Sequence, residues 1–246
     1  MRRRAGSGSG ESDRGVHPIG LFFNGVKVST AATAERTGDP LANVPELVLA
    51  STSPRRRRLL ETAGLAHRAV APRVDDSDLP MEVGQRVAER TVALAWLKGA
   101  ATMHTLRCEG RRSVLIVAAD TLVADGDRAL GKPASSDEAE QMLRILAGRD
   151  HRVWTGHAVI DLESGRRRLW VDSATVRIGA LDEELLVRHL ERRDWEGRAG
   201  GYSLDELEAA GWSVECSGDP EVVLGLSTAG VRRAIASLAV DAGRGA

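Results

Sequence analysis

The stretch Leu49–Gly64, LASTSPRRRRLLETAG, joins a strand to a helix. It continues the apolar run that begins at Glu46, and Ser53 followed by Pro54 has the pattern of a helix start, with the serine as N-cap and the proline at the first helical position. Gly64 marks the helix end. A helix that begins directly after a strand presents unpaired backbone N–H groups and the positive end of its dipole, which predicts an anion site.

Four consecutive arginines occupy the first turn of this helix. Arg55 and Arg56 lie three to four residues before a pair of leucines, so helical geometry turns them toward the buried face. Arg57 and Arg58 are typical of a solvated face, since Arg57 sits one turn from Glu61. The sequence therefore predicts that Arg55 and Arg56 contact the anion. An ordinary arginine-rich solvated face is the alternative interpretation of the whole run.

The composition limits the class of protein. The chain has 246 residues, 42% of them hydrophobic, which suffices for one sizeable core. A formal net charge of -1 and an aromatic content of 3% argue against a nonspecific nucleic-acid binder. Two cysteines form neither a disulfide framework nor a metal-ligand spacing and favour a cytoplasmic protein. Because no segment approaches about 18 consecutive apolar residues, we expect no membrane span.

The chain divides into an extension and a body. Residues 1–44 are rich in Gly, Ser, Arg and Thr, so we expect them to be a flexible extension. In residues 45–246, strands are predicted over 46–51, 113–120, 121–133 with an Asp-Gly turn, and twice over 151–178. Helices are predicted over 86–103, 135–148, 181–193 and 226–240 from their apolar spacing. This alternation predicts an α/β fold, a mixed sheet covered by helices.

Two further segments suit phosphate chemistry. Asp120 ends the predicted strand 113–120, and a carboxylate at the carboxyl end of a strand faces the crevice where open α/β sheets bind ligands. Lys132 lies in GDRALGKP, which has the P-loop spacing, but Pro133 replaces the required Ser or Thr and no helix follows the lysine. Lys132 is therefore either a loop lysine near Asp120 or an ordinary surface lysine.

Acidic and basic composition add two weaker signals. The run VDDSD contains Asp75, Asp76 and Asp78, whose carboxylates are the hard ligands that magnesium prefers, although acidic loops are usually only solvated. Among 34 basic residues only Lys27, Lys98 and Lys132 are lysine. A chain so biased toward arginine either keeps a lysine where a compact ammonium meets a phosphate or retains these three by chance.

Taken together, five segments resemble the Maf family of nucleoside triphosphate pyrophosphatases: LASTSPRRRRLLETAG, VDDSD, AADTLVADGDRALGKP, EAEQMLRILAGRDHRVWTG and GRAGGYSL. The resemblance runs from about Glu46 to Leu238. It implies a Maf/ITPase-like fold, an elongated mixed β-sheet flanked by helices with two lobes and a central cleft. It also implies hydrolysis of a nucleoside triphosphate to the monophosphate and pyrophosphate, with Mg²⁺ or Mn²⁺ as cofactor, and a homodimer.

The resemblance also implies roles for individual residues. Asp120 matches the catalytic carboxylate that acts as base for the attacking water, and Asp76 and Asp120 match the metal-binding positions. The chemistry is consistent, since attack of water at a phosphoryl centre needs neutralisation of the polyphosphate charge and a base. The substrate-binding positions are Ser51, Ser53, Arg55, Arg56, Lys98, Thr121, Lys132 and Asp205.

Three positions govern base preference in the family. Arg55 and Thr121 match the members that prefer dTTP and UTP, whereas Asp205 stands where those members have Gln. An amide both donates and accepts hydrogen bonds but an ionised carboxylate only accepts, so this change alters the preferred base edge. Further departures from the family pattern are Arg198 for Lys, Val222 for Asn and Ser227 for Pro.

We therefore expect an enzyme of nucleotide-pool house-cleaning that hydrolyses pyrimidine or modified nucleoside triphosphates and has no nucleic-acid or membrane partner. One alternative is a noncatalytic, nucleotide-sensing regulator of septum formation, the role for which the family is named. A catalytically dead member would be expected to lose Asp120 or Lys132, and this chain keeps both. The other alternative is a nucleic-acid binder using Arg55–Arg58, which a steep salt dependence of DNA or RNA affinity would support.

Overall fold

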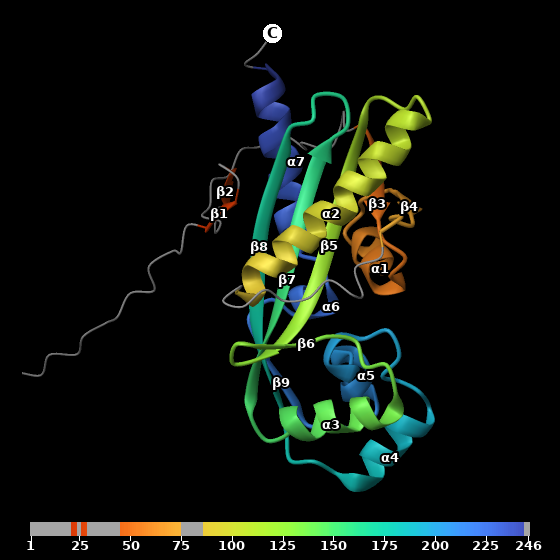
Figure 1. The fold of residues 1–246 in the computed structure, drawn as a ribbon, viewed down its shortest axis with the longest axis vertical. Helices are drawn as coiled ribbons and strands as arrows, with labels where there is room; N and C mark the ends of the chain where they lie inside the picture. The colour runs from red at the N-terminus through yellow and green to blue at the C-terminus, as the bar shows by residue number, and fades with distance from the viewer. Residues whose placement is uncertain (1–20, 24–25, 29–44, 75–85, 244–246) are drawn as a thin grey trace, which may run out of the picture.

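The structure is a computed structural model that describes residues 21–23, 26–28, 45–74 and 86–243. Its centre is a mixed seven-stranded sheet in the order β4-β3-β5-β7-β8-β9, with β6 paired to β5 (Figure 1). The strands of this sheet are β3 (Glu46–Ala50), β4 (Arg68–Val70), β5 (Val114–Asp125), β6 (Arg128–Leu130), β7 (Asp150–Asp161), β8 (Arg167–Ile178) and β9 (Val214–Ser217).

Three 12-residue strands, β5, β7 and β8, form the long axis of the molecule and pair antiparallel along nearly their whole length. β3 pairs parallel with both β5 and β4. Residues 114–120 of β5 are all buried, as expected for a strand that is covered on both faces. The sheet is therefore mixed, as the sequence pattern predicts.

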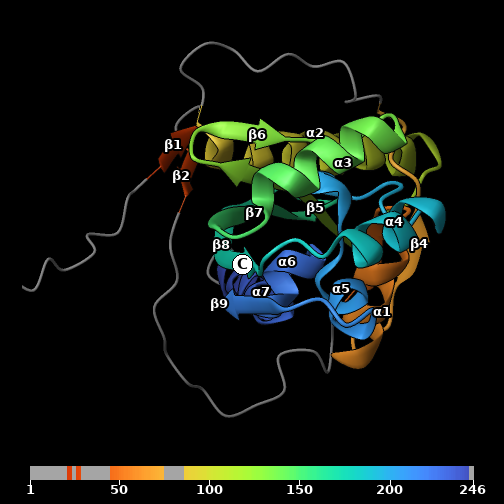
Figure 2. The same ribbon diagram turned by 90° about the horizontal axis from the view of Figure 1, so that it is seen from below.

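Helices cover the sheet in two groups. The helices are α1 (Pro54–Thr62), α2 (Val87–Cys108), α3 (Ser136–Leu146), α4 (Glu183–Glu191), α5 (Leu204–Ala209), α6 (Pro220–Leu224) and α7 (Thr228–Gly243), with a 3₁₀ turn, η1, at Ala199–Gly201. Figure 2 shows α2 on one side of the long strands and α7 on the other. Figure 1 shows α3, α4 and α5 gathered at one end of those strands, away from α7.

The hydrophobic core has three parts that correspond to this division. One part lies between the sheet and α1 with α7, a second between the sheet and α2, and a third among α3, α4, α5 and the far ends of the long strands. The first two stabilise one lobe and the third stabilises the other. The long strands run through both lobes, so the predicted two-lobed mixed α/β fold is confirmed.

α2 lies unusually close to the sheet at Gly156 of β7. A Cβ atom at this position would lie 2.3 Å from the carbonyl carbon of Thr91, so only glycine fits without moving the helix. Gly156 is the register partner of Asp120 on β5. The close contact therefore brings α2 down onto the sheet beside the predicted catalytic carboxylate.

The structure confirms most of the predicted elements and corrects one. The strand-to-helix junction at Ser53, a helix within 135–148 and two strands within about 151–178 are as predicted. The prediction that a strand ends at Asp120 is wrong, because β5 continues without a break to Asp125. Short elements that the apolar pattern did not reveal are β4, β9, α5 and α6.

The prediction of a flexible extension over residues 1–44 falls mostly outside the described residues. Within that range, β1 (Leu21–Phe23) and β2 (Val26–Val28) pair antiparallel. Among the described helices, none has the length and apolar character needed to cross a membrane.

Candidate active site

Two adjoining cavities, of about 100 and 620 Å³, form a cleft beside the start of α1. Both are lined by Ser53, Arg55, Arg56, Lys98, Lys132 and Gly197. The smaller cavity extends to Asp120 and Thr121, and the larger one extends to Ser51 and Asp205. The structure thus brings all the predicted substrate-binding residues and Asp120 together around one cleft, whereas Asp76 lies outside the described residues. The roles assigned to these residues stay predictions.

The start of α1 is shaped by two serines. The Ser53 hydroxyl accepts a hydrogen bond from the backbone N–H of Arg56 at 3.5 Å and caps the helix. The buried Ser51 hydroxyl accepts from the backbone N–H of Ser53 at 3.1 Å. A serine hydroxyl that accepts still has its own hydrogen to donate, so both side chains can serve an anion as donors.

The four arginines divide as the helical geometry predicts. Arg55 and Arg56 are half-buried, whereas Arg57 and Arg58 are exposed. Arg58 nevertheless lines the larger cavity, so its assignment to a merely solvated face is incomplete.

Arg55 sits in a partly desolvated cluster of charges. Burial lowers its pKa from the usual value, and the positive charge of Arg198 lowers it further, while Glu206 and Asp205 act in the opposite direction. Its Nε is buried and has no hydrogen-bond partner among the described residues. Such a donor suits a ligand in the cleft.

Arg56 is held at two points by other elements. Its Nε donates to the carbonyl oxygen of Gly225, directly after α6, at 2.8 Å. Its Nη2 donates to the hydroxyl of Thr121 on β5 at 3.1 Å. Because an arginine fork is planar, two fixed N–H groups define the orientation of the whole guanidinium.

Asp120 lies in the middle of β5, and Lys98 reaches it from α2. The Lys98 Nζ donates a hydrogen bond to Asp120 Oδ1, and both side chains are largely buried. The pair links the helix to the sheet, and both residues line the smaller cavity.

A gap at the edge of the sheet explains how a mid-strand carboxylate reaches the cleft. On one edge of β5, β3 pairs with residues 114–117 and β6 pairs with residues 123–125. Within the described chain, no strand pairs with residues 118–122 on that edge. Successive side chains of a strand point to opposite faces, but at an open edge both faces border the same space. Asp120 and Thr121 therefore both line the cleft.

The second lobe contributes Lys132 and the segment around α5. Lys132 is exposed in the loop after β6 and lines both cavities. Asp205, in the first turn of α5, accepts from the Ser203 hydroxyl at 2.5 Å. Glu206 accepts from Arg198 Nη2 at 2.5 Å, and both line the larger cavity. The sequence singled out Arg198 only as a departure from the family pattern, and no sequence signal revealed Glu206.

The described residues include no group of three or more His, Cys, Asp or Glu side chains arranged to hold a metal ion. Asp120 is a carboxylate at the cleft, and a single protein carboxylate together with substrate phosphates is a common way for proteins to bind Mg²⁺. The donor chemistry of the cleft therefore fits a hard divalent cation that binds together with a polyphosphate.

Comparisons with known proteins show the family to which the chain belongs. The family model described as Maf-like protein matches residues 46–238. A dTTP/UTP pyrophosphatase of Chelativorans sp. (strain BNC1) is 38% identical over 183 residues, which are 74% of this chain and 85% of the relative. A protein of the same name from Pelotomaculum thermopropionicum is 39% identical over 165 residues, 67% of this chain and 82% of the relative.

The solved structure of the Staphylococcus aureus Ham1 protein shows a weak overall similarity to this chain, with a TM-score of 0.36. Its sequence is 15% identical, and the matched region covers 54% of this chain and 71% of the Ham1 chain. The family model spans most of the chain, and relatives above 30% identity are covered over more than two thirds of their length. This chain belongs to the Maf family.

Proposed function

We propose that this protein hydrolyses a nucleoside triphosphate to the monophosphate and pyrophosphate. The observation that carries the proposal is the convergence of Arg56, Lys98 and Lys132, from separate segments of the chain, on a cleft that also contains the Asp120 carboxylate. Three cations match the charge of a polyphosphate, and a carboxylate can orient a water molecule and accept its proton. The name of these relatives, dTTP/UTP pyrophosphatase, supports the same reaction.

Some residues of the cleft bind the phosphates, and one accepts a proton. The hydroxyls of Ser51 and Ser53 and the guanidinium of Arg56 bind phosphate oxygens at the start of α1. Asp120 accepts a proton from the water that attacks the α-phosphorus, and the bond from that phosphorus to the bridging oxygen breaks, which releases pyrophosphate. Lys98 holds the Asp120 carboxylate in its orientation.

The proposed cofactor is Mg²⁺ or Mn²⁺. Asp120, together with the predicted ligand Asp76, would hold the cation, which would neutralise charge on the phosphates when bound.

The proposed substrates are pyrimidine nucleoside triphosphates such as dTTP and UTP, or modified nucleotides. Arg55, Thr121 and Asp205 are the residues proposed to select the base. Apolar side chains of Val223 and Leu224 line the smaller cavity beside Thr121 and suit the flat face of a base. The proposed role is cytoplasmic removal of excess or noncanonical nucleotides.

A nucleotide panel tests the proposal. The purified full-length protein is incubated with Mg²⁺ or Mn²⁺ and each of dTTP, UTP, CTP, modified pyrimidine nucleoside triphosphates and the purine nucleoside triphosphates. Pyrophosphate and orthophosphate are quantified separately. We expect pyrophosphate from at least one pyrimidine substrate and its loss in Asp120→Asn. Asp125→Asn, the same change on the same strand but outside both cavities, should retain activity. No release across the panel, or release of orthophosphate instead, would overturn the proposal.

A further inference from the structure

We propose that Thr155 is a positioning residue, whose hydroxyl acts through Thr121 to fix the guanidinium of Arg56 for phosphate binding. The proposal rests on the proposed function, because it assumes that Arg56 binds the substrate. Thr155 lies on β7, is fully buried and lines neither cavity of the cleft.

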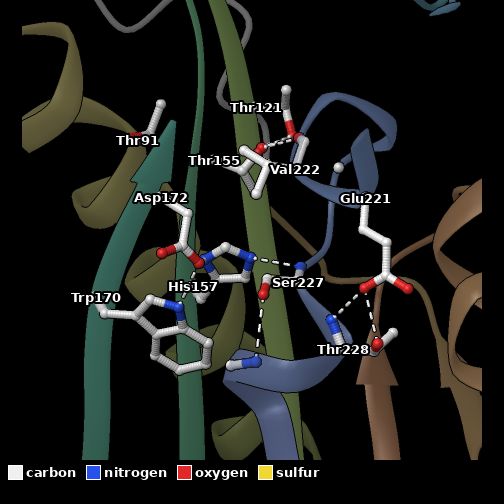
Figure 3. A network of polar contacts seen from close by, with 12 residues as sticks. Thr91, Thr121, Thr155, His157, Trp170, Asp172, Glu221, Val222, Ser227 and Thr228 are labelled. Atoms are coloured by element: carbon white, nitrogen blue, oxygen red, sulfur yellow. Dashed lines mark hydrogen bonds and ion pairs between the residues drawn. The ribbon is translucent and has the colours of Figure 1, made fainter. Parts of the chain in front are cut away.

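The direction of the hydrogen bonds connects Thr155 to Arg56. Thr155 Oγ1 lies 2.7 Å from the carbonyl oxygen of Val222, which can only accept, so the single hydroxyl hydrogen of Thr155 is used there (Figure 3). Thr121 Oγ1 lies 3.0 Å from Thr155 Oγ1 and must therefore donate to it. Thr121 in turn accepts from Arg56 Nη2 at 3.1 Å. The relay runs from the guanidinium through Thr121 and Thr155 to the Val222 carbonyl.

Backbone carbonyls in α6 and directly after it accept the hydrogen bonds at both ends of this arrangement. The carbonyl of Val222 ends the relay, and the carbonyl of Gly225, three residues later, accepts directly from Arg56 Nε at 2.8 Å. Gly225 has a φ of 107°, and a Cβ there would lie 3.1 Å from Arg56 Nε, so the glycine gives the guanidinium close access to the helix end. Two acceptors, one in α6 and one at its C-cap, therefore determine how Arg56 enters the cleft.

β7 also holds the chain that follows α6. His157, two residues after Thr155 and on the same face of the strand, accepts at Nε2 from the backbone N–H of Ser227 at 3.0 Å. Burial, and to a lesser extent the charge of Arg56, lowers the pKa of His157 to about 3, so the ring is neutral and able to accept near neutral pH. The ring stacks on Trp170 with centroids 4.6 Å apart. Thr155 and His157 thus form hydrogen bonds with α6 and with the chain directly after it, at Val222 and Ser227.

The relay limits what Thr121 can do for a bound nucleotide. Its hydroxyl hydrogen is directed to Thr155, so the side chain cannot donate to a base without breaking the relay. Thr121 can therefore contribute to base selection as an acceptor but not as a donor. Thr155 lines neither cavity, so the loss of its hydroxyl should lower activity by a similar factor whichever base the substrate carries.

Paired variants of the full-length protein test this role. Thr155→Val replaces the hydroxyl with a methyl group of similar size, and we expect kcat/KM to fall about 10- to 100-fold, as for a small misplacement of a binding group. Thr155→Ser, which restores the donor, should return to within about threefold of the unaltered protein. Thr105→Val, which removes a hydroxyl that donates to the Ala101 carbonyl within α2, should leave activity unchanged.

A double-mutant comparison separates positioning from general packing. In an Arg56→Ala background, Thr155→Val should produce no further loss, because the group that the relay positions is gone. Additive losses, full activity of Thr155→Val, or failure of Thr155→Ser to recover would each overturn the proposal. If Thr155→Val does not fold, Thr121→Val with its Thr121→Ser partner interrupts the same relay from the cleft side and is judged by the same criteria. An inactive unaltered protein would instead overturn the proposed function, and nucleotide-binding affinities of the same variants would then decide the role of the relay.

Discussion

Lys98 Nζ and Asp120 Oδ1 are hydrogen-bonded across the interface between α2 and β5, and their side chains are only 14% and 10% exposed. Lys98→Met would leave the carboxylate largely buried without its ammonium partner. We expect the free energy of unfolding to fall by about 1–3 kcal/mol and pyrophosphate release to fall at least about 100-fold, because Asp120 loses its orientation. Urea denaturation and a pyrophosphate assay measure the two effects.

An ion pair at the start of the same helix, between its N-cap residue and its first turn, provides the control for this prediction. Arg86 contacts Glu89 at 2.7 Å, and its side chain is mostly exposed. Arg86→Met should change stability by no more than about 1 kcal/mol, because exposed pairs contribute little. Equal losses of unfolding free energy in Lys98→Met and Arg86→Met would show that burial does not increase the contribution of the Lys98–Asp120 pair to stability.

Gly156→Ala tests the contact between β7 and α2. The added methyl would lie 2.3 Å from the Thr91 backbone, so the helix must move. We expect a loss of about 3 kcal/mol or more in unfolding free energy, together with lower activity, since Lys98 moves with α2. Gly131→Ala, where a Cβ would meet nothing within 4 Å, should change stability by about 0.5 kcal/mol or less. Similar stabilities for the two variants would contradict the close contact.

Two buried histidines should make the protein sensitive to mild acid. Burial lowers the pKa of His157 to about 3 and that of His151 to about 4, whereas an unfolded histidine titrates near 6.5. Between pH 6 and 5 the unfolded chain therefore binds more protons than the folded one, so stability falls as pH falls. Each histidine contributes up to about 1.4 kcal/mol per pH unit in this window.

Chemical denaturation at pH 7, 6 and 5 measures this slope. His157→Asn, a neutral acceptor that does not titrate, should remove roughly half of the histidine contribution. A slope that His157→Asn does not reduce would show that His157 is not held neutral in the folded protein.

Asp205→Gln tests base selection. An ionised carboxylate accepts from the amino group of cytosine but cannot donate to the carbonyl of uracil, whereas an amide can do both. We expect the ratio of kcat/KM for UTP over CTP to rise about tenfold, the scale of one hydrogen bond. Glu208→Gln, an exposed change on the same helix, should leave the ratio unchanged. An unaltered ratio in Asp205→Gln would exclude this residue as a base-selecting group.

The sequence predicted those parts of the site that depend on short-range geometry. Ser53, Pro54 and the buried side of α1 follow from local rules of capping and helical periodicity, and the structure places Arg55 and Arg56 at the cleft. The alternation of apolar runs also predicted the mixed sheet, because burial sets the periodicity of the side chains directly.

The remaining features depend on contacts between distant segments. The gap in pairing along β5 arises because β3 and β6 reach different parts of one edge, and an apolar run does not reveal where its neighbours end. The strand was therefore predicted to stop at Asp120. Thr155 and Glu206 likewise gain their partners from other elements, and neither has a spacing in the sequence that would identify those partners.

The continuous pairing of β5, β7 and β8 has a mechanical consequence. Because the ladder between them runs without interruption through both lobes, no hinge within these strands separates the two walls of the cleft. The width of the cleft is therefore set by strand register when the chain folds, and a nucleotide enters a rigid frame in which side chains and loops make the adjustments. The same frame ties the stability of one lobe to that of the other, so the body of the protein should unfold in a single cooperative transition.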